Sequence, residues 1–268
     1  MDRFFISGCQ RSGTTMLRLI LESHPAIQCF DEAAGYDLLV RESKGEGGEF
    51  LVKEGITLLG FKIPRFAEQL TWPEFIDPDY GTFPSFYNNQ KVIHVVRDVL
   101  DVVGSMMRLK TVGGASWLDR YGRTILQALI QHPNVSAAYK KKYADLERQE
   151  LPLHLVGALY WEIKNQGFLD LLERKKPVCA VRYESLVGSP MSELLKLTQF
   201  LGVNWSDSLI NHPEHPHGEL DENGIAIGET DPSRSIDTKS IGGYRHLMTG
   251  QQVEEVKDFV KNYTSNTH

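Results

Sequence analysis

The sequence predicts an α/β protein with a single domain, in which helices flank a parallel central sheet. Three times along the chain, an apolar strand-like segment precedes a helical pattern: 3–7 before 14–23, 91–98 before 99–109, and 177–186 before 192–202. Strands that alternate with helices form parallel sheets with both faces covered. The 268 residues suffice for one large core, and no linker or repeat divides 1–268.

The first half of the chain contains a helix and a further strand candidate. The helix at 14–23 carries apolar residues at helical spacing and stops before "HP". The apolar run "ITLLGF" predicts another strand, from whose end Lys62 emerges.

The second half is mostly helical between 113 and 175, most clearly over 154–174. The helix at 192–202 ends at a capping glycine, and an amphipathic helix at 249–263 begins at a threonine cap. Residues 206–245 show little periodicity, which predicts a long ordered loop of the kind that often carries function.

Composition and charge are those of a globular protein. The chain is 41% hydrophobic and 24% charged, with a formal net charge of −6. An acidic chain has no bulk attraction for nucleic acid or anionic membranes, so an anionic ligand needs a local cluster of cations. No apolar stretch approaches the roughly 20 residues that span a bilayer. The three cysteines and the lack of a signal-peptide pattern predict buried thiols and a cytoplasmic location.

The stretch "FFISGCQRSGTT" (4–15) predicts an anion-binding loop. Gly8 and Gly13 bracket four residues and precede a helix, so that backbone N–H groups and the helix N-terminus can surround an anion. A nucleoside-triphosphatase loop has lysine after the second glycine. Here Thr14 takes that place, and the cation, Arg11, lies inside the loop. The strand at 91–97 ends in Arg97 instead of a Mg²⁺-binding aspartate, so we expect no metal.

A second cationic site follows the strand at 91–98. Arg97 stands at its carboxyl end, where open α/β sheets bind ligands, and Ser105 follows about two helical turns later. The two could grip one oxyanion. Alternatively, Arg97 pairs with Asp98 or Asp101, and Ser105 is a surface serine. Together with the loop, the site fits a nucleotide with a phosphate at each end of its ribose.

The segments "GCQRSGTT", "VVRDVLDVVGS" and "VRYESLV", in this order, resemble the sulfotransferase superfamily, which uses 3′-phosphoadenosine-5′-phosphosulfate (PAPS) and releases PAP. The resemblance covers residue 4 to about 262 and implies a P-loop-like sulfotransferase fold. It implies that the loop holds the 5′-phosphosulfate, that Arg97 and Ser105 hold the 3′-phosphate, and that Tyr183 lies near the adenosine. The implied donor-binding residues are Arg11, Ser12, Gly13, Thr14, Thr15, Met16, Arg97, Ser105 and Tyr183. A looser match over 233–245 adds Ser235, Lys239 and Arg245 as candidates.

The transferred sulfuryl group carries one negative charge, so fixed cations can replace Mg²⁺. We expect Arg11 and Lys62 to supply them, because "KIPR" resembles the family segment whose lysine reaches the sulfonate. The alternative for Lys62 is a solvated surface lysine. Cytosolic small-molecule sulfotransferases carry a histidine two residues after this lysine, where this chain has Pro64.

Another base is therefore required. "HPAIQCFDEAAGYDLL" resembles the tyrosylprotein sulfotransferase segment whose second acid is the base, which corresponds to Glu32. Burial near an apolar pocket could raise the pKa of this carboxyl so that it accepts the acceptor's proton. Glu32 could instead serve only as a favourable acid at a helix N-terminus. Asp31 is its nearest competitor.

The histidines His212, His215 and His217, with Asp221, could suggest a metal site. Prolines between them break the helix that would align such ligands, so a polar loop bordering the acceptor pocket is favoured.

The sequence predicts a PAPS-dependent sulfotransferase with Glu32, Arg11 and Lys62 as catalytic residues. The expected acceptor bears a hydroxyl on a small molecule, carbohydrate, lipid or carrier-bound acyl chain. A P-loop kinase or nucleotide hydrolase, which would need Mg²⁺-ATP, and a non-catalytic PAP-binding protein are the alternatives.

Overall fold

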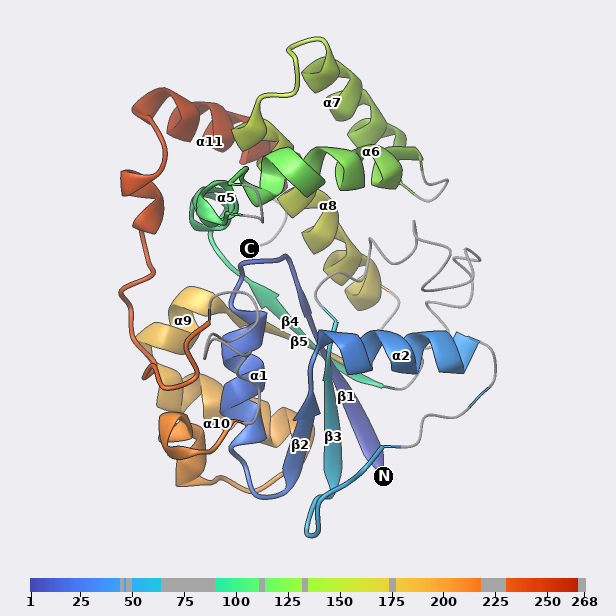
Figure 1. The fold of residues 1–268 in the computed structure, drawn as a ribbon, viewed down its shortest axis with the longest axis vertical. Helices are drawn as coiled ribbons and strands as arrows, with labels where there is room; N and C mark the ends of the chain where they lie inside the picture. Colours follow the sequence, from blue (N-terminus) through green and yellow to red (C-terminus); the bar gives the residue numbers. More distant parts are fainter. Residues whose placement is uncertain are drawn as a thin grey trace.

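The computed structural model describes residues 1–43, 46, 50–63, 90–110, 114–131, 135–173, 177–217 and 230–264. Across these ranges, five strands form one parallel sheet in the order β2-β3-β1-β4-β5 (Figure 1). They are β1 (Asp2–Gly8), β2 (Ile27–Phe30), β3 (Leu58–Lys62), β4 (Lys91–Val96) and β5 (Val178–Arg182). The predicted α/β fold with a parallel central sheet is confirmed.

Strand side chains alternate between the two faces of the sheet. Phe4 and Ile6 of β1 pack in one hydrophobic cluster with α1 (Thr14–Glu22), α9 (Tyr183–Gly188) and α10 (Pro190–Leu201). Phe5 belongs to a second cluster, which includes Leu38 of α2 (Glu32–Ser43). All strands end at the same edge, so that the segments that follow them meet there.

A helical layer continues above the sheet in Figure 1. It contains α5 (Val99–Arg108), the π-helical turn η1 (Leu118–Gly122), α6 (Arg123–Gln131), α7 (Ala137–Glu147), α8 (Leu153–Glu173) and α11 (Gly250–Thr264). Its hydrophobic cluster includes the fully buried Val103, Met106 and Tyr160. On the sheet below, His94 Nε2 of β4 lies 3.1 Å from Asn165 Oδ1 of α8, which ties this layer to the sheet.

The third predicted strand extends too far. β5 ends at Arg182, and Tyr183 begins α9, whereas the sequence predicted a strand over 177–186. The spacing of apolar residues does not show where a short apolar strand ends and a short helix directly after it begins. The prediction of buried thiols is also wrong for Cys179, which is partly exposed, whereas Cys9 and Cys29 are buried.

The predicted caps are present at two helices. Gly202 ends α10 in the left-handed conformation with φ 81°, and Thr249 Oγ1 accepts a hydrogen bond from the Gln252 amide at 3.2 Å at the start of α11. The predicted loop at 206–245 contains the 3₁₀ turns η2 (Asp207–Leu209), η3 (His212–Glu214) and η4 (Gly243–His246). Pro64 and Asp221 lie outside the described residues. Within the described part of the chain, no helix is long and apolar enough to cross a membrane.

Candidate functional site

The loop between β1 and α1 depends on left-handed backbone. Arg11 has φ 70°, and Gly13, the N-cap of α1, has φ 96°. A Cβ atom on Gly13 would lie 2.5 Å from the ring of Tyr183, so that only glycine fits both the conformation and the space. The N-terminus of α1 at Thr14 therefore opens directly on the loop, an arrangement that favours a bound anion.

A cavity of about 520 Å³ lies at this loop. The loop, α1, β4–α5 and the segment 230–247 line it, and its wall contains every predicted donor-binding residue except Ser12. Ser12 is fully buried, and its Oγ has no hydrogen-bond partner among the described residues. Of the looser candidates, Ser235 and Lys239 line the cavity. Arg245 donates a hydrogen bond to the Gly242 carbonyl at 3.4 Å.

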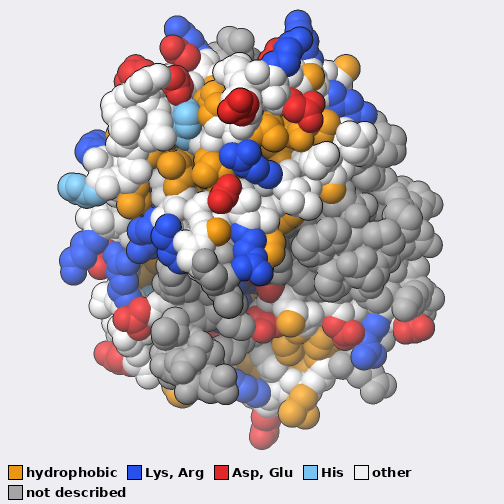
Figure 2. Space-filling model, turned by 45° about the horizontal axis from the view of Figure 1, so that its top comes forward, with side chains coloured by type: hydrophobic (Ala, Val, Ile, Leu, Met, Phe, Trp, Pro, Cys, Tyr) orange, Lys and Arg blue, Asp and Glu red, His pale blue; other side chains and the backbone are white. Residues whose placement is uncertain are grey.

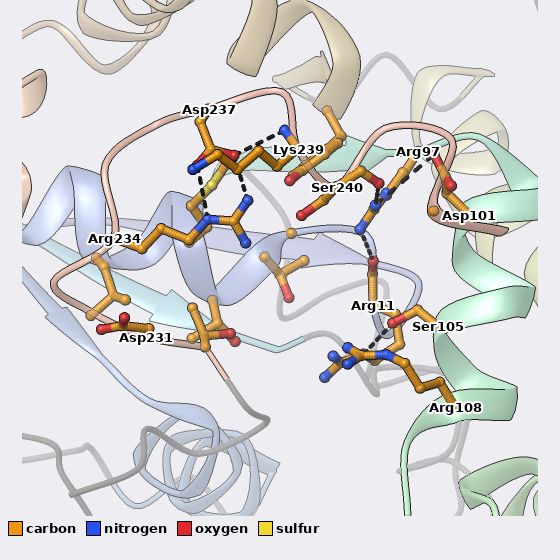
Figure 3. A pocket seen from close by; sticks show the side chains of 18 of the residues that line it. Arg11, Arg97, Asp101, Ser105, Arg108, Asp231, Arg234, Asp237, Lys239 and Ser240 are labelled. Atoms are coloured by element: carbon orange, nitrogen blue, oxygen red, sulfur yellow. Dashed lines mark hydrogen bonds and ion pairs between the residues drawn. The ribbon is translucent and has the colours of Figure 1, made fainter. Parts of the chain in front are cut away.

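The two predicted phosphate sites are linked. Arg11 Nε donates to Ser105 Oγ at 3.0 Å, and the Arg97 guanidinium donates to the Arg11 carbonyl at 3.0 Å (Figure 3). Arg97 also donates to the Ser240 carbonyl at 2.6 Å and lies 4.2 Å from the centre of the Tyr183 ring. Residues from four segments therefore converge on one cationic end of the cavity.

Asp101 holds the segment 240–244 in place next to Arg97. Its buried carboxylate accepts the Gly242 amide at 2.8 Å and the Tyr244 amide at 3.2 Å, and it lies 4.0 Å from the Arg97 guanidinium. Asp98 instead caps α5 by accepting the Leu100 amide at 2.9 Å. Of the two acids considered as partners of Arg97, the structure therefore selects Asp101, and Arg97 still lines the cavity.

Sequence reasoning missed Arg108, Arg234 and Asp237, which also line the cavity. Arg234 Nε donates to Asp237 Oδ2 at 3.1 Å, and this contact holds the pKa of the Asp237 carboxyl below its usual value. Figure 3 places this pair on the opposite side of the cavity from Arg11 and Ser105. Arg234 and Asp237 stand three residues apart in a loop rich in turn-forming residues. This spacing was the feature of the sequence that could have predicted their ion pair.

Local positive charge is also visible on the surface. On the face shown in Figure 2, lysine and arginine side chains gather below a band of hydrophobic side chains, although the formal net charge of the chain is −6.

Lys62 ends β3 and is buried, so the alternative of a solvated surface lysine is wrong. Its Nζ lies 3.3 Å from the Glu32 carboxylate and donates to Thr15 Oγ1 at 3.0 Å. Burial lowers the pKa of the Lys62 ammonium, and the neighbouring Glu32 carboxylate opposes this shift. The described lining of the cavity includes Thr15 but neither Lys62 nor Glu32, so the pair borders the cavity through Thr15.

Asp31 and Glu32 have different tasks at the start of α2. Asp31 Oδ1 accepts the Ala34 amide at 3.0 Å and thereby caps the helix. Glu32 stands in the first helical turn, with its carboxylate next to Lys62. Asp31, the alternative candidate for the general base, therefore serves as the helix cap. Glu32 is the acid whose carboxylate lies beside Lys62.

The three histidines lie together, and His212 lines the cavity. Within the described residues, no group of three or more His, Cys, Asp or Glu side chains could hold a metal ion.

Comparison with known proteins identifies the family. The family model described as the sulfotransferase domain matches residues 1–268. The chain belongs to the sulfotransferase domain family. The protein-tyrosine sulfotransferase of Drosophila melanogaster is 23% identical over 282 residues, which cover 96% of this chain and 50% of that protein. A Caenorhabditis briggsae protein, provisionally assigned to the same class, is 22% identical over 275 residues, covering 95% of this chain and 84% of its own.

Solved structures share the fold of this sulfotransferase domain. The sulfotransferase domain from the curacin biosynthetic pathway has a TM-score of 0.57 at 17% identity, covering 97% of each chain. A mouse sulfotransferase in complex with PAP has a TM-score of 0.52 at 16% identity, covering 99% of this chain and 85% of its own.

Proposed function

We propose that this sulfotransferase domain moves the sulfuryl group of PAPS to a hydroxyl acceptor by in-line displacement, with Glu32 as the general base. The observation that carries the proposal is the convergence of two cationic elements on one cavity. The loop with Arg11 meets the N-terminus of α1, and Arg97 and Ser105 stand beside it on β4–α5.

The cavity suits the donor in size and in chemistry. Its volume of about 520 Å³ falls within the usual range of ligand pockets. The loop amides, Arg11 and the α1 N-terminus would hold the 5′-phosphosulfate, and Arg97 and Ser105 the 3′-phosphate. The mouse sulfotransferase of similar fold was crystallised with PAP, which supports this class of donor.

The transfer forms one bond to sulfur and breaks another. The acceptor oxygen attacks sulfur while its proton passes to the Glu32 carboxylate, and the bond from sulfur to the 5′-phosphate oxygen breaks. The products are a sulfate ester and PAP. Lys62 and Arg11 would stabilise the charge that develops on the leaving phosphate oxygen.

The acceptor is proposed at the level of its reacting group. Relatives named protein-tyrosine sulfotransferases act, by their names, on a phenolic hydroxyl. This chain spans about half the length of the Drosophila relative, so its own acceptor could be a phenol or an alcohol on a small molecule, carbohydrate, lipid, carrier-bound acyl chain or peptide.

Calorimetric titration with PAP, 5′-AMP and Mg²⁺-ATP tests the proposal. We expect PAP to bind roughly 10- to 100-fold more tightly than AMP, because a 3′-phosphate adds charge-assisted hydrogen bonds. Turnover of PAPS with a panel of hydroxyl acceptors, followed by mass spectrometry, would complete the test. A preference for Mg²⁺-ATP over PAP would overturn the proposal in favour of a kinase or hydrolase.

A further inference from the structure

The loop that carries Arg11 contains a tight turn over residues 9–12. The Ser12 amide donates a hydrogen bond to the Cys9 carbonyl at 3.1 Å, and of the two residues between them only Arg11 has a positive φ, at 70°. This is the pattern of a type II turn, whose third residue is usually glycine or asparagine. An arginine in the left-handed conformation is strained, and it persists only where its surroundings hold it. The position of Arg11 therefore depends on the contacts of this turn.

One of these contacts comes from α8, in the helical layer above the sheet. The Tyr160 hydroxyl donates a hydrogen bond to Gln10 Oε1 at 2.7 Å. Tyr160 is fully buried, and the Trp117 ring meets its ring edge to face, with the centroids 5.7 Å apart. The Lys164 ammonium lies 5.2 Å from the centre of the same ring. Packing therefore fixes the tyrosine, so that its hydroxyl holds the Gln10 side chain in one place.

Gln10 is the second residue of this turn, the position at which proline is common in type II turns. Proline fixes φ through its ring, whereas glutamine leaves φ variable. The hydrogen bond from Tyr160 restrains Gln10 through its side chain instead. The next residue of α8, Trp161, donates its indole N–H to the Arg97 carbonyl at 3.0 Å. Two adjacent residues of one helix therefore contact the two segments that carry Arg11 and Arg97.

We propose that Tyr160 is a positioning residue for Arg11 and acts through Gln10. This inference rests on the proposed function, in which Arg11 stabilises the charge that develops on the leaving phosphate oxygen. Such stabilisation depends on donors that are in place before the reaction. Without the Tyr160 hydroxyl the turn is less restrained, and the Arg11 guanidinium is less well placed. Arg97 and Ser105 keep their places, so the change affects the rate of transfer more than the affinity for the donor.

Tyr160→Phe tests the assignment, because it removes only the hydroxyl and keeps the ring. With PAPS and an acceptor identified in the panel, we expect kcat to fall roughly three- to tenfold, as loss of one neutral hydrogen bond would cause, with KM for PAPS nearly unchanged. Hydrogen exchange at the Ser12 amide, which closes the turn, should quicken by a similar factor. PAP affinity, measured by calorimetry, should change less than about twofold.

Two variants of Gln10 show whether Tyr160 acts through this residue. Gln10→Met removes the acceptor of the hydrogen bond, so it should lower kcat as Tyr160→Phe does, and the double variant should lose no more than either single variant. Gln10→Pro sets φ of the same residue through its ring. In that background we expect kcat near the wild-type value and no further effect of Tyr160→Phe. If Gln10→Pro does not fold, the cycle with Gln10→Met decides.

Tyr143→Phe is the matched control, because Tyr143 of α7 is buried in the same hydrophobic cluster, and it should change neither kcat nor the exchange at Ser12. Additive losses in Tyr160→Phe and Gln10→Met, or a loss of PAP affinity as large as the loss of kcat, would overturn the role of Tyr160. If the wild type transfers no sulfuryl group from PAPS, the proposed function itself fails. Exchange at the Ser12 amide then still shows whether Tyr160 holds the turn, so the two failures are distinguishable.

Discussion

The Glu32 carboxylate and the Lys62 ammonium lie 3.3 Å apart at the end of β3, close enough to neutralise each other. A carboxylate in such an ion pair can accept a proton more readily once the lysine forms an ion pair with another anion instead. Under the proposed function, that anion is the bound phosphosulfate, so donor binding would release Glu32 to accept the acceptor's proton. Thr15 Oγ1, which also accepts from Lys62, keeps the lysine next to the loop.

Glu32→Gln should separate binding from chemistry. We expect turnover with PAPS to fall roughly 10²- to 10⁴-fold, the usual contribution of a general base, while PAP affinity changes little. Asp31→Asn is the matched control, because asparagine caps a helix as well as aspartate does, and it should keep its turnover. Steady-state kinetics and calorimetry measure both. Parallel loss of turnover and PAP affinity in Glu32→Gln would assign Glu32 a structural role.

At the scale of elements, α5 and the segment 240–244 form one unit through Asp101. A buried carboxylate that accepts two backbone amides holds a loop more firmly than neutral groups do. The same unit keeps the Ser240 carbonyl on Arg97. On the opposite side, Trp161 of α8 donates its indole N–H to the Arg97 carbonyl at 3.0 Å, so a helix of the upper layer also positions this arginine.

Asp101→Ala should loosen this unit. Hydrogen exchange at the Gly242 and Tyr244 amides should quicken, and PAP affinity should fall roughly tenfold or more, because Arg97 loses its support. Asp119→Ala, on the exposed surface of η1, is the control and should change neither quantity. Exchange measured by mass spectrometry, with calorimetry alongside, checks both. Unchanged exchange at 242 and 244 would show that Asp101 does not hold the segment.

At the scale of the whole molecule, buried histidines link stability to pH. Burial lowers the pKa of His94 to about 4, from 6.5 in an exposed chain. The unfolded chain therefore binds the proton more tightly, so the stabilisation is present above pH 6.5 and is lost as the pH falls toward 4. His212 has a lowered pKa of about 4 for the same main reason and adds to the effect.

We expect the free energy of unfolding to fall by about 2 kcal/mol for His94 alone between pH 7 and pH 5. His94→Gln should be less stable at pH 7 but should show a flatter dependence on pH. Urea unfolding at both pH values measures the difference, with His246→Gln at the surface as the control. An equally steep dependence in His94→Gln would contradict the assignment.

The features of the fold and site that can be predicted from the sequence are those that depend on residues close together in the chain. Apolar periodicity located strands and helices, and the pattern of glycines, Arg11 and Thr14 located the loop, because each depends on neighbours in sequence. Tyr183 shows the limit, since an aromatic residue after an apolar run suits either a strand or a short helix. The contact of Asp101 with Gly242 joins residues 141 positions apart, and no spacing rule reveals it. The position of His212 in the cavity wall likewise depends on packing against α1.

The segment 240–244, which contacts Arg97 and Asp101, is synthesised late. The order of synthesis therefore determines when these contacts can form. A ribosome delivers the chain from its N-terminus, so the five strands, α1 and α5 all emerge before residue 240. A nascent chain that stops short of this residue can pair its strands, yet Arg97 and Asp101 lack these later partners. Under the proposed function, a nucleotide whose 3′-phosphate is held by Arg97 would therefore find this arginine fully positioned only after synthesis has passed residue 240.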